Sequence, residues 1–133
     1  MTTGGKLTPS IKSAEYSCNT GAVNCNVYST ITDASSGDKI TFATGGTEVW
    51  NATKLALGST ATFQDFANLA AAGTGANTNA QVSWFQFGGD TYLVQDRSAS
   101  ASFVNGTDIM VKLTGLIDCS GASFNSAGTL VIA

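Results

Sequence analysis

The chain contains no histidine, and this absence removes several familiar kinds of chemistry. Histidine is the side chain whose unperturbed pKa lies closest to neutral pH, and it is the usual base that activates a serine or cysteine nucleophile. It is also a principal ligand of zinc. Most familiar hydrolase mechanisms are therefore excluded, whereas catalysis by carboxylates and binding of calcium by oxygen atoms remain possible for these residue types. We expect no enzymatic activity.

Charge is also scarce, since only 11% of the 133 residues are charged and the formal net charge is −3. With no basic field to attract phosphates, nucleic acid is not an expected partner. No run approaches the roughly 18 apolar residues of a membrane-spanning helix. The segment Met1–Lys6 lacks the apolar core of a signal peptide. We therefore expect no membrane insertion. If the chain is exported, we expect its export to use no N-terminal signal.

Cysteine occurs three times, as Cys18, Cys25 and Cys119, so at least one thiol has no partner within the chain. Cys18 and Cys25 are seven residues apart and each precedes an asparagine. This pattern fits either equivalent inward positions of successive short strands or a local disulfide. Cys119 stands where an aliphatic residue would fit, which favours a buried small hydrophobe. Without a CxxC pair, a cysteine metal site is not expected.

What the chain does have is a series of short β-like runs between glycine-rich turns. The clearest are 82–87 and 91–96, which are separated by Gly88-Gly89-Asp90 and predict a β-hairpin. Further strands are predicted at 39–43, 108–114 and 129–133, and residues 47–57 fit one bent strand or two short ones. The cysteine-asparagine repeat before residue 32 is typical of stacked short strands.

One helix is predicted, beginning near Thr62 and ending at Gly73. Asp65 follows Thr62 by three residues, which is the spacing of a capping box. The expected apolar face consists of Phe63, Phe66, Ala67, Leu69 and Ala70.

Two motifs in a fixed order suggest a family. Residues 84–96 read W-F-Q-F-G-G-D-T-Y-L-V-Q-D, and residues 107–118 read T-D-I-M-V-K-L-T-G-L-I-D. This pair resembles the C-terminal module of RTX-type bacterial surface-layer proteins, the RsaA-like group, in which a hairpin W/F-F-x-F-x-G-x-T-Y-x-V precedes D-x-x-V-x-L-T-G. The strand at 38–42 is similar to the G-D-x-I-x-F strand that starts this module. The glycine- and aspartate-rich calcium nonapeptide of such proteins is absent.

The resemblance implies a mostly β fold in two parts. Residues 1–32 would be β-roll-like rungs, the remnant of a β-roll or β-solenoid. Residues 33–133 would form a β cap domain that contains the hairpin and one short helix. The apolar segment 126–133 would belong to the uncleaved C-terminal signal of a type I secretion pathway.

The resemblance also implies a function and partners. The chain would be a non-enzymatic structural domain of a secreted protein at the bacterial cell surface. Its partners would be the type I secretion machinery, further copies in a surface lattice, and calcium, which would be linked to folding. The alternative is a carbohydrate- or ligand-binding β-module of a bacterial adhesin, with a groove lined by aromatic residues: Trp50, Trp84, Phe85, Phe87 and Tyr92.

Four aspartates are candidate calcium ligands: Asp33, Asp38, Asp90 and Asp108. Calcium takes six to eight oxygen ligands, often from carboxylates and turn carbonyls. Asp33 and Asp38 flank a Ser-Ser-Gly turn, and the other two lie at predicted strand edges. The same positions also suit aspartates that cap turns and strand ends through hydrogen bonds.

Overall fold

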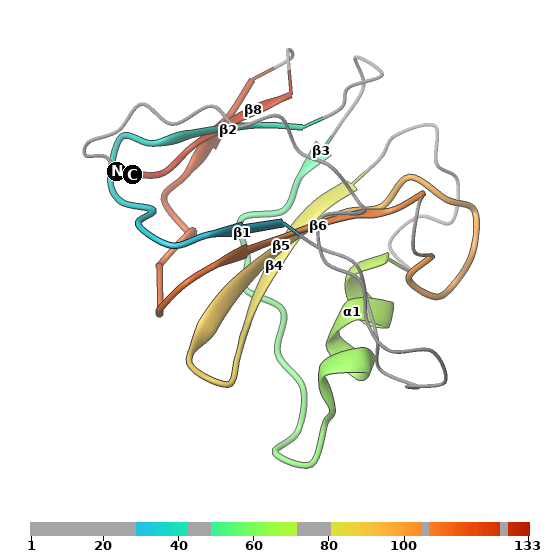
Figure 1. Ribbon diagram of the computed structural model, residues 1–133. Coiled ribbons are helices and arrows are strands. Elements are labelled where there is room, and N and C mark those ends of the chain that lie inside the picture. The colour runs from blue at the N-terminus through green and yellow to red at the C-terminus, as the bar shows by residue number, and fades with distance from the viewer. Residues whose placement is uncertain (1–28, 43–48, 72–80, 105–106, 126–127) are drawn as a thin grey trace.

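The computed structural model describes residues 29–42, 49–71, 81–104, 107–125 and 128–133, which form two β-sheets and one short helix (Figure 1). This confirms the prediction of a mostly β fold with a single short helix in the described part of the chain. None of these residues belongs to a helix long and apolar enough to cross a membrane. The elements are β1 (Ser29–Ile31), β2 (Lys39–Thr41), β3 (Val49–Trp50), α1 (Phe63–Ala71), β4 (Gln81–Phe87), β5 (Asp90–Gln95), β6 (Ile109–Leu113), β7 (Ser123–Phe124) and β8 (Thr129–Val131).

The larger sheet has the strand order β1-β6-β5-β4-β3. Its three central strands are antiparallel, and each edge strand runs parallel to its neighbour. The predicted hairpin is confirmed as β4 and β5, with Phe87 opposite Asp90. Gly88 and Gly89 form the two-residue turn with φ values of 61° and 91°. Such turns need positive φ at both positions, which glycine adopts without strain.

The helix covers one face of this sheet (Figure 1). Phe66, Ala67, Ala70 and Ala71 of α1 pack against residues of the central strands: Phe85, Tyr92, Val94 and Met110. The predicted capping box is confirmed, because Thr62 N donates to Asp65 Oδ2 (2.9 Å) and Asp65 N donates to Thr62 Oγ1 (3.1 Å). The placement of Leu69 on the apolar face was wrong, since this side chain is 40% exposed.

The smaller sheet, with the order β2-β8-β7, lies over the opposite face of the larger one (Figure 1). Alternate residues of the central strands point toward it, including Trp84, Leu93 and Val111. Ile40 and Leu130 are paired across β2 and β8, and both are fully buried in the core between the sheets. The last strand is therefore the middle strand of this sheet and part of its core.

The β-roll rungs predicted for residues 1–32 fall mostly outside the described residues, and so do Cys18 and Cys25. The described end of that segment contributes β1, which pairs with β6 through Ser29–Val111 to Ile31–Leu113. The division into 1–32 and 33–133 remains a prediction. Cys119 is confirmed as a buried small hydrophobe, with its thiol free and its side chain in the core between the sheets.

Candidate functional site

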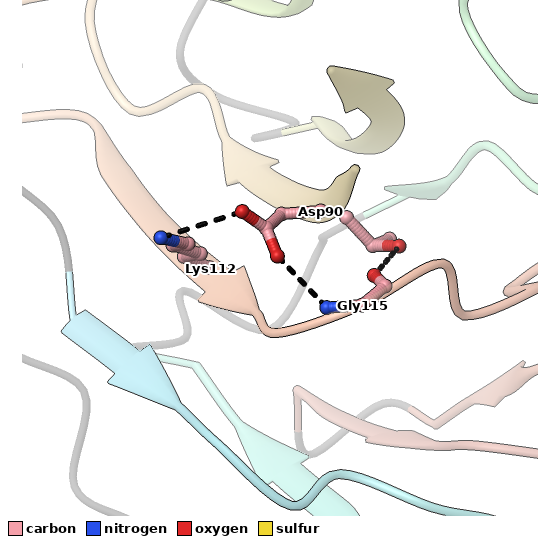
Figure 2. A network of polar contacts seen from close by, with 4 residues as sticks. Asp90, Lys112 and Gly115 are labelled. Carbon is pink, nitrogen blue, oxygen red and sulfur yellow. Dashed lines mark hydrogen bonds and ion pairs between the residues drawn. The ribbon is translucent and has the colours of Figure 1, made fainter. Parts of the chain in front are cut away.

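The first polar cluster lies where the hairpin meets the turn after β6, and it contains the predicted ligand Asp90 (Figure 2). Asp90 Oδ1 accepts a hydrogen bond from Gly115 N (2.8 Å), and Oδ2 lies 3.4 Å from Lys112 Nζ. The Gly115 hydrogen bond, and after it the charge of Lys112, lower the pKa of the Asp90 carboxyl below its ordinary value, against the opposing effect of burial. Asp90 is therefore ionised at neutral pH and holds the turn.

Thr91 completes this cluster from inside the protein. Its side chain is fully buried, and its hydroxyl donates to Gly115 O (2.9 Å) while accepting from Ile117 N (2.8 Å). Gly115 has a φ of 93°, a left-handed conformation that suits glycine. Asp90 and Thr91 of the first motif thus bind the backbone of Gly115 and Ile117 in the second. We name these four residues the hairpin–turn joint.

Asp108 has a comparable role in the connection between β5 and β6. Its carboxylate is fully buried and accepts hydrogen bonds from Arg97 N (2.7 Å), Ser98 Oγ (3.1 Å) and Val104 N (2.7 Å). Both carboxylate oxygens have partners from the protein itself. This side chain fixes the conformation of the loop that leads into β6.

Asp38 differs from Asp90 and Asp108 in having one unpartnered oxygen. Oδ2 accepts from Ser35 N (2.8 Å), but Oδ1 is buried and has no partner in the described part of the chain. Asp33, at the start of the same turn, is exposed. Among the residues that the structure describes, no group of three or more histidine, cysteine, aspartate or glutamate residues could hold a metal ion. Calcium binding by the four aspartates stays a prediction. Asp38 is the first candidate ligand among them, because its Oδ1 has no hydrogen-bond partner in the described part of the chain.

A second polar cluster lines an open groove of about 660 Å³ on the larger sheet. We name it the Lys54 groove; its lining residues are Ala52, Thr53, Lys54, Trp84, Gln86, Asp118 and Ser120. No motif in the sequence indicated this groove. Its walls come from segments more than 60 residues apart, and the irregular run 47–57 was the only local sign of an unusual backbone.

One wall of the groove is a bulge in the chain that follows β3. Asn51 N donates to Val82 O (2.8 Å) and Leu55 N donates to Trp84 O (3.0 Å). The three residues 52–54 thus stand opposite the single residue Ser83, so this side has two extra residues, as in a β-bulge. Asn51 Oδ1 accepts from Thr53 N (3.2 Å) and stabilises the displaced segment.

The opposite wall is the turn 118–120, which Cys119 anchors by its burial in the core. Asp118 and Ser120, on either side, are exposed to the groove. Hydrogen bonds from Ser120, and to a smaller extent the charge of Lys54, lower the pKa of Asp118. Burial, followed by the charge of Asp118, raises the pKa of the Cys119 thiol to about 12. The thiol is therefore protonated and inert at neutral pH.

The aromatic residues of the alternative hypothesis are mainly core residues. Trp84, Phe85 and Tyr92 are 2%, 0% and 7% exposed. Trp50 is half-buried and stacks on Phe124, with ring centroids 6.3 Å apart. Phe87 is half-buried and packs edge-on against Phe63 and Phe66 of α1. These rings do not form an exposed aromatic platform, and Trp84 alone among them lines the Lys54 groove.

Comparisons with known protein families and with curated protein sequences found no match to this chain.

Proposed function

We propose that this chain is a non-enzymatic structural domain of a secreted bacterial surface protein of the RTX surface-layer type. In this proposal it carries a C-terminal signal for type I secretion and contributes to lattice assembly and calcium-linked folding at the cell surface.

The observation that carries the proposal is the hairpin–turn joint. The resemblance depends on two short motifs in a fixed order, and either motif alone is weak. In the folded chain, Asp90 and Thr91 of the first motif hydrogen-bond to Gly115 and Ile117 of the second. The polar residues of the two motifs therefore stabilise the same turn. A shared structural role of this kind would explain why the two motifs occur together. This supports reading them as one module.

The burial of the C-terminal strand sets a condition on the secretion signal. Leu130 is fully buried and Ile132 is 3% exposed, so their side chains are inaccessible once the smaller sheet has formed. A secretion machine that recognises this apolar segment must therefore act before the domain folds. Export should depend on the sequence of residues 120–133 and should not require the folded state.

This condition defines the experiment. The chain is fused to the C-terminus of a reporter enzyme in a bacterium that has a type I secretion system, and the reporter is measured in the medium. One variant has residues 120–133 scrambled. The matched control is Ile40→Asn, which puts an amide in the core opposite Leu130 and prevents folding but leaves residues 120–133 unchanged. We expect export to be lost with the scrambled segment and retained with Ile40→Asn.

The opposite pattern would refute the secretion role. Export of the scrambled variant at the wild-type level would show that the segment is not the signal.

The calcium part of the proposal is tested by a melting curve with millimolar calcium and, as a control, with millimolar magnesium. An ion that binds only the folded chain raises the stability of the folded state by mass action. We expect calcium to raise the melting temperature of the wild type and to have less effect on Asp38→Asn. An unchanged melting temperature in calcium would show that folding of this chain is independent of the ion.

A further inference from the structure

The Lys54 groove has the size and the fixed walls of a binding site. Its volume of about 660 Å³ lies within the range of roughly 300–1,000 Å³ that is typical of small-molecule sites. The bulge at 52–54 forms one wall and the turn at 118–120 forms the other. The groove is thus formed by backbone features that the rest of the fold holds in place.

The floor is also fixed by hydrogen bonds. Trp84 Nε1 donates to Ala52 O (2.8 Å), which ties the bulge to β4. Gln86 lies between the walls: its Nε2 donates to Ile117 O (3.1 Å), and its Oε1 accepts from Lys54 Nζ (3.2 Å). These contacts orient the Gln86 amide and direct the Lys54 ammonium group across the groove. A ligand would therefore meet polar groups that are already in place.

The charges in the groove favour a neutral ligand. Lys54 and Asp118 carry opposite charges and Lys54 acts on Asp118 electrostatically, so the pair presents no net charge. An anion would be attracted by Lys54 and repelled by Asp118, and a cation would be attracted by Asp118 and repelled by Lys54. A neutral ligand with many hydroxyl groups gains from both, because a hydroxyl can accept from the ammonium group and donate to the carboxylate.

The remaining lining residues match the same chemistry. Thr53 and Ser120 are exposed hydroxyl residues, which donate and accept hydrogen bonds, and Trp84, which is only 2% exposed, closes the floor of the groove. We propose that the Lys54 groove is a binding site for a neutral saccharide. This site does not depend on the secretion role, and of the hairpin aromatics it includes Trp84 alone.

The test is titration of the isotopically labelled chain with neutral trisaccharides, namely maltotriose, cellotriose and mannotriose, followed by NMR. The Gln86 side-chain amide and the Trp84 indole N–H are the reporters within the groove. Trigalacturonic acid and glutamate are the charged probes. We expect at least one neutral trisaccharide to shift both reporters at millimolar concentration and the charged probes to have weaker effects.

Two pairs of variants locate the site. Lys54→Met removes the ammonium group, and its matched control is Lys39→Met, on an exposed position of β2 in the other sheet. Loss of one charge-assisted hydrogen bond should weaken binding by about tenfold or more, and the control should bind as the wild type does. Ser120→Trp fills the groove from an exposed position and should abolish binding, whereas Ser59→Trp, also exposed, should not. Unchanged melting temperatures would show that all four variants are folded.

Three results would overturn the proposal. The first is that no neutral trisaccharide shifts the two reporters. The second is equal binding by Lys54→Met and Lys39→Met. The third is stronger binding of a charged probe than of every neutral one, which would assign the groove to another class of ligand.

Discussion

The two faces of the larger sheet are covered in different ways. On one face, α1 packs against rings of the adjacent hairpin, so the covering element and the strands are close together in the sequence. On the other face, β2 and β8 pair although Thr41 and Thr129 are 88 residues apart. The first cover needs only local chain closure, whereas the second forms when distant parts of the chain meet. The comparison separates a local core rich in stacked rings from a non-local core in which aliphatic residues outnumber the rings.

The largest expected loss of stability comes from the helix-covered face. The Phe85 ring is fully buried and stacks on Phe66 (5.0 Å between centroids) and on Tyr92 (5.2 Å). Phe85→Ala should lower the free energy of unfolding by about 3–5 kcal/mol, because it leaves a cavity and removes both stacked pairs. Urea denaturation measures the change. Phe124→Ala, at a half-buried ring, is the control and should cost less; an equal loss would mean that burial does not decide the effect.

A somewhat smaller loss is expected on the opposite face. Leu130 is fully buried in the middle strand of the smaller sheet, and Leu130→Ala should lower the free energy of unfolding by about 2–4 kcal/mol. The two faces share the central strands, so this variant should still unfold in one transition by circular dichroism and tryptophan fluorescence. Two separate transitions would show that the non-local cover is an independent unit.

The hairpin–turn joint provides the next test, because it connects the local hairpin to the turn beyond β6. Thr91→Val keeps the shape of the side chain but leaves Ile117 N–H and Gly115 C=O without the hydroxyl. We expect a loss of about 1–2 kcal/mol in urea denaturation. Thr30→Val, at an exposed position of β1, is the matched control and should change stability by less than about 0.5 kcal/mol. Equal effects of the two variants would show that the hydrogen bonds of the hairpin–turn joint do not stabilise the fold.

The smallest effect is the dependence of stability on pH through Asp90. Its pKa is lower in the folded chain, where Gly115 and Lys112 stabilise the ionised carboxylate. Protons therefore bind the unfolded chain first, and this contribution is present above the ordinary carboxyl pKa and lost as the pH falls below about 4. Melting temperatures of the wild type and Asp90→Asn, measured across this range, should converge on acidification. Asp118, whose pKa is also lowered, adds acid dependence common to both proteins. Curves that stay parallel would contradict the role of Asp90.

The local parts of the fold were predictable from the sequence. The Gly88-Gly89 turn between two apolar runs and the spacing of Thr62 and Asp65 indicated the hairpin and the helix start, and both are present. Leu69 was misplaced because it was grouped by hydrophobicity: at one position from Ala70 and two from Ala67, it lies outside the stripe of buried residues.

The non-local parts could not be read from the sequence. β7 has two residues and β3 has two, and such short strands are defined by their partners and have no period of their own. The strand predicted at 129–133 is present as β8, but its central place between β2 and β7 could not be read from the sequence. The Lys54 groove was missed for the same reason, since Lys54, Gln86 and Asp118 come together only through the sheet.

Amide hydrogen exchange at Gly115 and Ile117 tests the hairpin–turn joint most directly. Both amides lie outside the strands, and each donates to a side chain of the hairpin, Gly115 to Asp90 and Ile117 to Thr91. We predict slow exchange of both in the wild type and a selective loss of protection at Ile117 in Thr91→Val. Fast exchange of Ile117 in the wild type, at the rate of an open loop amide, would contradict the claim that these residues unite the two motifs.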